Sequence, residues 1–164
     1  MCAIASISFL SNLEIAIGRV RSNAAPETDG SSVLSGMRFL CAEDNALNDE
    51  ILEAILEMYG ASCTTRPDGA ELVKAFEMVK PGEYDAILMD IQMPELNGLE
   101  ATKRIRALSR ADAAAIPIIA MTADAYAEDV EKAVSAGMNY HLSKPIEPEE
   151  LYKVLAQQIT GYRQ

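Results

Sequence analysis

The sequence predicts an α/β domain in which helices cover both faces of a five-stranded, doubly wound parallel sheet. Two observations predict this class. From Met37 onward, five short apolar runs alternate with segments of helical period. The runs are apolar at consecutive positions, which is typical of strands buried on both faces of a parallel sheet. Parallel neighbours need crossover connections, so the intervening helices are expected to cover the sheet on both sides.

The first half of this pattern contains three expected strands and two expected helices. Gly60 is suited to end the first helix, Asp68 to cap the second, and Pro81 to stop it. In order, the elements are a strand at 37–42, a helix at 47–59, a strand at 63–65, a helix at 70–80 and a strand at 86–89.

The second half continues in the same way. Gly98 opens the third helix and Gly137 closes the fourth. In order, the elements are a helix at 98–108, a strand at 116–121, a helix at 125–136, a strand at 140–143 and a helix at 147–159.

Residues 1–36 are expected to be an N-terminal extension and linker, and residues 37–164 the folded domain. The segment 22–36 is small and polar, which is linker composition. Residues 3–20 show rough apolar alternation, which leaves a strand, a short hairpin or disorder open. A signal peptide is not indicated, because the start lacks a basic region and Glu14 interrupts the apolar run.

The composition excludes several classes of function. A net charge of −11 argues against binding nucleic acid or anionic membrane surfaces. It suits carboxylates gathered around a cation, although a plain acidic surface would give the same charge. Cys2, Cys41 and Cys63 have neither disulfide nor zinc spacing, which favours a reducing cytoplasm. No apolar run is long enough for a membrane helix.

Polar side chains stand where four of the five expected strands end. Glu43 and Asp44 follow the first strand, Asp90 the third, Thr122 the fourth, and Lys144 the fifth. Ligands of open α/β sheets bind outside the carboxyl ends of the strands. The sequence therefore predicts that these groups share one site.

The chemistry of that site follows from its residue types. Three ionised carboxylates repel one another, and a divalent cation relieves the repulsion. Oxygen ligands with few protein carboxylates suit Mg²⁺, which commonly shares a phosphate oxygen. Lys144 and Thr122 can each meet a phosphoryl oxygen, which leaves Asp90 as the nucleophile. There is neither a P-loop nor a G-x-G-x-x-G turn, so a nucleotide enzyme of those types is excluded.

Four stretches taken together carry a resemblance: CAEDNALN, ILMDIQMPELNGLEAT, IIAMTADA and HLSKPI. From Met37 to about Ile159 the chain resembles the receiver domain of bacterial two-component response regulators. The AEDNxxN and MDIQMPxxNG forms are most similar to receivers of hybrid sensor histidine kinases. The resemblance implies a flavodoxin-like (βα)5 fold.

The resemblance also implies a role for each site residue. A histidine kinase or histidine phosphotransfer domain would pass a phosphoryl group to Asp90, and Thr122 and Lys144 would approach that group. The Lys144–Pro145 bond would be cis. The implied Mg²⁺ ligands are Glu43, Asp44, Asp90 and the backbone carbonyl of Gln92.

The chain departs from the receiver pattern in two places. Receivers carry Tyr or Phe three residues before the lysine, as a switch ring, and here His141 stands there with Tyr140 beside it. His141 as the switch, Tyr140 as the switch after a local shift, and weaker coupling all stay open. The connection 109–117 is longer than usual and is expected to be an extended helix or a loop without effect on the site.

The leading hypothesis is a phosphoacceptor receiver in a two-component phosphorelay, with no catalysis beyond acceptance and loss of its own phosphoryl group. One alternative is an aspartyl-nucleophile phosphatase, but such enzymes typically carry a second Asp where Gln92 stands. Another is an unphosphorylated docking or dimerisation module, and a homodimer is compatible with either signalling role. The chain is expected to be a stand-alone receiver or a piece of a hybrid kinase.

Overall fold

The computed structural model describes residues 32–123 and 126–163, which form one five-stranded sheet and five helices. Residues 1–31, with the apolar alternation at 3–20, lie outside the described residues. The strands are β1 (Arg38–Ala42), β2 (Ser62–Arg66), β3 (Ala86–Asp90), β4 (Ile118–Thr122) and β5 (Tyr140–Ser143). The helices are α2 (Ala46–Met58), α3 (Gly69–Met78), α4 (Gly98–Arg106), α5 (Ala127–Ala136) and α6 (Pro148–Arg163).

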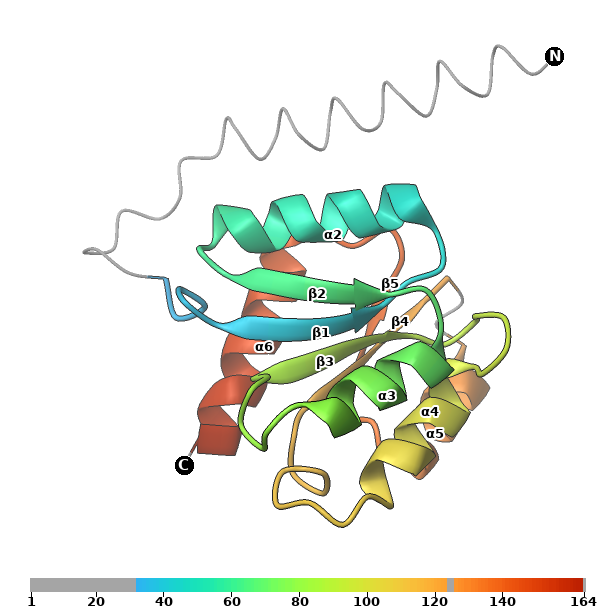
Figure 1. Ribbon diagram of the computed structural model, residues 1–164. Coiled ribbons are helices and arrows are strands. Elements are labelled where there is room, and N and C mark those ends of the chain that lie inside the picture. Colours follow the sequence, from blue (N-terminus) through green and yellow to red (C-terminus); the bar gives the residue numbers. More distant parts are fainter. Residues whose placement is uncertain (1–31, 124–125, 164) are drawn as a thin grey trace, which may run out of the picture. The chain divides into compact units, whose positions relative to one another are not determined.

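All paired strands are parallel, in the order β2-β1-β3-β4-β5. Helices α2 and α6 cover one face of the sheet, and α3, α4 and α5 cover the other (Figure 1). Each face has its own apolar core, so the inner strands are buried on both sides, and every residue of β3 and β4 is buried. The predicted fold class is confirmed, because continuous apolar runs do report burial on both faces.

Short polar side chains start three of the helices. Asn45, Asp68 and Asn97 stand in extended conformation before α2, α3 and α4, and each side chain accepts a hydrogen bond from a backbone N–H of the first turn. This capping satisfies donors that the helix itself cannot pair. Helix α5 ends at Gly137, whose φ of 107° belongs to the left-handed region that glycine adopts most easily.

Two segments lie differently from the simplest reading of the sequence. Leu34, in the segment with linker composition, is fully buried against the α2–α6 core, and residues 33–36 form a turn. The connection between α4 and β4 consists of turns and bends, so of the two expected forms it takes the loop. Arg110 pairs with Asp112 inside this connection and donates to the backbone carbonyl of Phe76, which holds the connection against α3. Among the described residues, no helix has the length and apolarity needed to cross a membrane.

Candidate functional site

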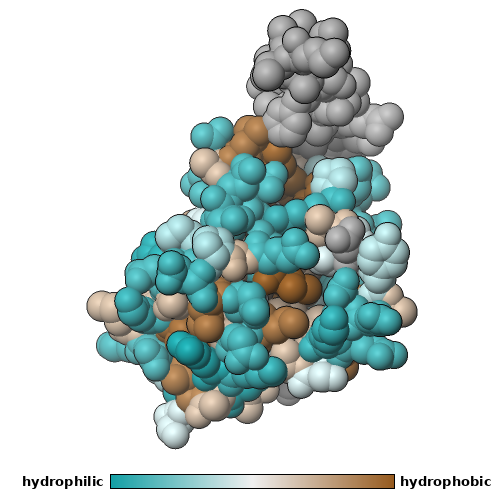
Figure 2. All heavy atoms as spheres, turned by 90° about the vertical axis from the view of Figure 1, so that its right-hand side faces the viewer, coloured by the Kyte–Doolittle hydropathy of each residue, from teal (hydrophilic) through white to brown (hydrophobic). Residues whose placement is uncertain are grey.

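The carboxyl ends of the five strands meet at one edge of the sheet, because all of them run in the same direction. Figure 2 views the molecule from that side, where hydrophilic residues predominate and hydrophobic residues show between them. The predicted site residues from β1, β3, β4 and β5 all stand at this edge. The topology therefore brings together groups that lie up to about a hundred positions apart in sequence, such as Glu43 and Lys144.

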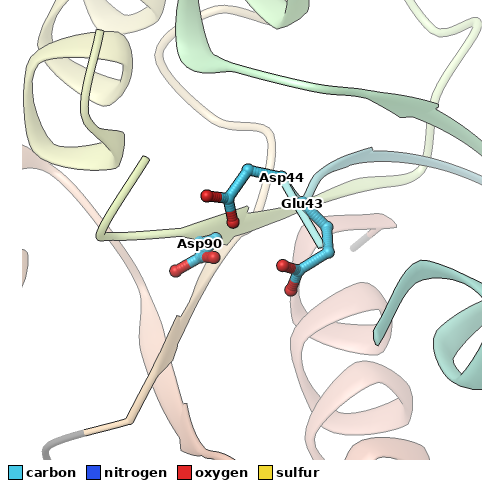
Figure 3. Close-up of side chains that lie close together, drawn as sticks. All are labelled: Glu43, Asp44 and Asp90. Carbon is cyan, nitrogen blue, oxygen red and sulfur yellow. The ribbon is translucent and has the colours of Figure 1, made fainter. Parts of the chain in front are cut away.

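Three carboxylates form the centre of the site. Glu43 and Asp44 directly follow β1, and Asp90 is the last residue of β3 (Figure 3). One oxygen from each lies within 4.8 Å of the others. Glu43 and Asp90 are each only 5% exposed, whereas Asp44 is exposed. The strand register explains why these side chains meet. Ala42 pairs with Met89, so the next residues along the two strands, Glu43 and Asp90, lie at the same level of the sheet.

Lys144 lies between two of these carboxylates. Its Nζ donates to Glu43 Oε2 at 2.7 Å and to Asp90 Oδ2 at 3.0 Å. The backbone N–H of Gln92 donates to the other oxygen of Asp90, at 3.1 Å. The Lys144–Pro145 bond is cis, as the resemblance implied.

Burial controls the ionisation of Asp90 and Lys144. Burial raises the pKa of Asp90 to about 6, against the opposing effect of Lys144, and the charge of Glu43 adds to the rise. Burial lowers the pKa of Lys144, but its hydrogen bonds to Glu43 and Asp90 outweigh this and leave its pKa above the ordinary value. Near neutral pH the site therefore holds an ionised Asp90 beside a charged lysine.

The donor set fits a small divalent cation. Three carboxylates face one ammonium group, which leaves an excess of negative charge in a partly buried place. Hard oxygen ligands of this kind are the ones that Mg²⁺ takes, with water completing its shell. Glu43, Asp44 and Asp90 could hold such an ion. The role of the Gln92 carbonyl stays a prediction, since only its N–H has a described contact.

Thr122 ends β4 beside this cluster. It is 5% exposed, and its backbone carbonyl accepts a hydrogen bond from the Lys144 N–H at 2.8 Å. Asp90 pairs with Met121 in the sheet, so Thr122 stands one position beyond Asp90 on the neighbouring strand. The structure thus places Asp90, Thr122 and Lys144 at the carboxyl ends of three successive strands of the sheet.

The two candidate switch rings lie on β5. His141 pairs with Ala120 and Tyr140 with Ile119. Because side chains alternate along a strand, His141 shares the face of Ala120 and Thr122, whereas Tyr140 is on the face of Leu142. The two rings stack with centroids 5.6 Å apart, and Tyr140 is 40% exposed. Strand parity therefore links His141, rather than Tyr140, to Thr122.

Two glycines support the site more closely than their sequence positions indicated. A Cβ on Gly98 would lie 2.3 Å from the Asp90 carbonyl oxygen, and one on Gly69 would lie 2.4 Å from the Leu96 carbonyl oxygen. The Gly69 N–H also donates to that oxygen, at 3.1 Å. The start of α3 therefore packs against the loop that follows Asp90. The sequence predicted Asp68 only as a helix cap and assigned no role to Gly69, because a single sequence does not show close approach of backbones.

Known proteins resemble the chain over most of the described domain. The family model of the response regulator receiver domain matches residues 39–156. A hybrid signal transduction histidine kinase I of Dictyostelium discoideum is 37% identical over 153 residues, which is 92% of this chain and 9% of that protein. Histidine kinase 3 of Arabidopsis thaliana is 35% identical over 141 residues, 74% of this chain and 13% of that protein. The chain thus spans a small part of these relatives.

Solved structures give the same picture. The receiver domain of the sensor histidine kinase PA1611 from Pseudomonas aeruginosa, solved with a magnesium ion coordinated in its active site cleft, is 40% identical with a TM-score of 0.69. The match covers 77% of this chain and 99% of that one. A second match is the co-crystal structure of the Saccharomyces cerevisiae histidine phosphotransfer protein Ypd1 with the receiver domain of its response regulator Ssk1, at 30% identity and a TM-score of 0.67. That match covers 77% of this chain and 91% of the matched chain.

Proposed function

Because this chain belongs to the response regulator receiver domain family, we propose that Asp90 accepts a phosphoryl group from a histidine kinase or a histidine phosphotransfer domain, with Mg²⁺ bound beside it. The observation that carries this proposal is the set of contacts at the carboxyl edge. Lys144, which follows β5, donates hydrogen bonds to Glu43, which follows β1, and to Asp90, the last residue of β3, and Asp44 lies in the same carboxylate cluster. The relatives' kinase names and the magnesium and Ypd1 complexes of the structural neighbours support it.

The transfer makes one bond and breaks another. A carboxylate oxygen of Asp90 attacks phosphorus, the phosphorus–nitrogen bond to the donor histidine breaks, and the electron pair of that bond returns to the imidazole ring. A bound Mg²⁺ would neutralise charge on the phosphoryl oxygens. Ionised Asp90 is the reacting form, and its pKa of about 6 keeps that form dominant at neutral pH. Lys144 is already at hydrogen-bond distance from Asp90, so it can follow charge added there.

The same residues couple phosphorylation of Asp90 to the β5 edge of the sheet. Thr122 stands on β4, one position beyond the residue that pairs with Asp90. It lies on the same face of the sheet as His141 of the neighbouring strand β5. Movement of Thr122 toward the phosphoryl group would open space next to His141, and the β5 edge would repack. Phosphorylation then acts as a local electrostatic change on an element with two arrangements.

The proposal includes two narrower statements. The chain turns over no separate substrate and catalyses only the gain and loss of its own phosphoryl group, since the site has Gln92 where an aspartyl phosphatase carries a second acid. It works in the cytoplasm, where histidine kinases deliver their phosphoryl groups and where Cys41 and Cys63 stay reduced.

Acetyl phosphate and beryllofluoride test the function directly. With Mg²⁺, the wild-type protein should form an acid-stable, base-labile acyl phosphate that phosphate-affinity electrophoresis resolves, and it should bind beryllofluoride. Asp90→Asn should lose both responses. Asp129→Asn, which removes a carboxylate on α5 that pairs only loosely with Lys132 at 3.6 Å, should keep both. A silent wild type, or a full response by Asp90→Asn, would overturn the proposal.

A further inference from the structure

A groove between α3 and α4 has features that the phosphorylation site does not use. The two helices lie side by side on one face of the sheet (Figure 1). The groove between them has a volume of about 380 Å³. Four of its lining residues are apolar and three are charged, namely Ala70, Val73, Ala107 and Leu108 with Lys74, Glu77 and Arg104. An apolar groove edged by charges is the kind of surface into which an amphipathic helix packs.

The charges at this groove favour an acidic partner. Lys74 pairs with Glu71 at 2.8 Å but remains 66% exposed. Arg104 is exposed, and its side chain has no ion pair or hydrogen bond within the part of the chain that the structure describes. Glu77 is the single carboxylate among the lining residues. The groove thus carries two cations against one anion, on a protein whose net charge is −11.

Helix α2 carries the complementary surface, since it has four acidic residues and no basic residue. An exposed stripe along it, the α2 stripe, has the spacing of one helix face and consists of Glu50, Glu53, Ala54, Glu57 and Met58. None of its three glutamates forms an ion pair among the described residues, and like charges at this spacing repel one another. Met58 is 42% exposed. A cationic groove with an apolar lining would relieve the repulsion and cover Met58.

We propose that the groove between α3 and α4 binds helix α2 of a second copy of this chain. Arg104 and Lys74 would pair with glutamates of the α2 stripe, and Met58 would lie against the apolar lining. Helix α2 and the groove lie on opposite faces of the sheet (Figure 1), so each copy offers α2 to one neighbour and its groove to another. Such a head-to-tail contact makes short chains or rings rather than a symmetric pair.

Sedimentation velocity of the full chain tests this association. One helix in one groove is a small interface, so we expect a dissociation constant of about 0.1 mM. At about 0.1 M salt, charges more than about 10 Å apart are screened, so local pairing outweighs repulsion between the net charges. The sedimentation coefficient of the wild type should therefore rise with protein concentration up to about 0.3 mM, which is above this expected constant.

Charge reversals locate the contact. Arg104→Glu and Glu53→Arg should each raise the dissociation constant by about tenfold or more, because an attracting pair becomes a repelling one. Glu77→Gln removes the carboxylate that repels the α2 stripe and should lower the constant by about twofold or more. The matched controls are Lys132→Glu and Glu128→Arg, which make the same reversals on α5, and they should stay within about twofold of the wild type.

Mixing the two defective variants tests whether the contact is head-to-tail. Arg104→Glu keeps an intact α2, and Glu53→Arg keeps an intact groove. An equimolar mixture should therefore recover one sound interface and form dimers that do not grow further. Both residues are exposed, and circular dichroism of each variant verifies that it is folded.

Several results would overturn the inference. A wild type that stays monomeric, or association that survives both reversals, excludes this contact. A mixture that stays monomeric excludes the head-to-tail arrangement, and equal losses in the α5 controls assign the effect to net charge. If Arg104→Glu loses association while Glu53→Arg keeps it, the groove binds another segment, and α2 is not its occupant.

Discussion

Gly98 lies directly against the backbone of Asp90: a Cβ on Gly98 would be 2.3 Å from the Asp90 carbonyl oxygen and 2.9 Å from Met89 Cγ. The Gly98 N–H also donates to the Ile91 carbonyl at 3.0 Å, so the first turn of α4 is tied to the loop after β3. Gly98→Ala must push this loop away. We expect it to lower the free energy of unfolding by about 1–3 kcal/mol, as overpacking does, and to weaken Mg²⁺ binding. Urea unfolding and calorimetry measure the two effects.

A second glycine provides the control for that experiment. Gly161 lies in α6, and a Cβ there would meet nothing within 4 Å. Gly161→Ala should raise the free energy of unfolding by about 0.5–1 kcal/mol, through helix propensity, and leave Mg²⁺ affinity unchanged. Equal losses of stability in the two variants would contradict the packing argument.

The raised pKa of Asp90 gives the metal-free protein a pH-dependent stability. Its pKa rises from 3.8 to about 6 on folding, so the folded protein binds this proton more tightly than the unfolded chain does. Stability from this group is therefore present below pH 3.8 and is lost as the pH rises to about 6. Asp90→Asn has no such titration. With a chelator present, its stability relative to wild type should grow by about 1 kcal/mol between pH 5 and pH 8.

Urea unfolding at both pH values measures this difference. Asp129→Asn, on the surface of α5, serves as the control, and its difference from wild type should stay the same at both pH values. Mg²⁺ should reverse the order at pH 8, because it binds the ionised carboxylate of Asp90 and so stabilises the wild type more than a variant that keeps only Glu43 and Asp44. A pH-independent difference for Asp90→Asn would show that burial does not raise this pKa.

The architecture could be predicted from the sequence because strands that are buried on both faces of a sheet appear as continuous apolar runs. The inner strands β3 and β4 are buried throughout and largely apolar, and their positions were predicted within two residues. β2 is an edge strand with no buried residue, and only its middle, 63–65, was identified. Leu34 lay in a segment of small polar residues, where one apolar side chain gives no period by which burial can be inferred.

The site was predictable in its members but not in its contacts. Parallel strands fix which chain ends meet, so Asp90, Thr122 and Lys144 followed from element order alone. The preference of Lys144 for Glu43 depends on side-chain reach across the sheet, which no spacing encodes. Which of His141 and Tyr140 shares the face of Thr122 depends on the register of β4 with β5, because a shift of one residue exchanges the two faces, and the switch role of His141 stays a prediction.

Glu95 holds an unfavourable backbone conformation in the loop after Asp90. Its φ is 63°, in the left-handed region that most side chains avoid. Asn tolerates this region better, so Glu95→Asn should raise the free energy of unfolding by roughly 0.5–1 kcal/mol. Glu95→Gln is the matched control, since it removes the same charge without relieving the backbone, and it should change stability by less than half as much. Equal gains would assign the effect to charge.

The long connection before β4 is fastened by a buried ion pair. Arg110 Nε donates to Asp112 Oδ1 at 2.6 Å, its guanidinium lies 4.0 Å from the centroid of the Phe76 ring, and the Gly82 N–H donates to Asp112 Oδ2 at 3.0 Å. Asp112→Ala leaves a buried arginine unpaired and should cost about 3–5 kcal/mol in urea unfolding. Replacing both, as Arg110→Met with Asp112→Ala, should recover part of that loss.

Beryllofluoride binding tests whether the connection between α4 and β4 affects the phosphorylation site. Beryllofluoride binding by the Arg110→Met and Asp112→Ala double variant should match the wild type under conditions where both are folded, because the connection shares no described contact with Asp90 or Lys144. A lost response in a folded double variant would contradict the expectation that the longer connection has no effect on the site.

His141 and Tyr140 can be separated by their faces of the sheet. His141→Ala should leave Mg²⁺ and beryllofluoride binding within about twofold, because no hydrogen bond or ion pair described for this structure joins the ring to Glu43, Asp44 or Asp90. The chemical-shift changes that beryllofluoride causes in α5 and β5 should shrink. His141→Tyr should restore them, since the larger ring occupies the same position. Tyr140→Ala is the matched control: its side chain alternates to the opposite face from Thr122, so the changes should persist. If Tyr140→Ala abolishes the changes and His141→Ala does not, the coupling runs through the other face, and the parity argument for His141 fails.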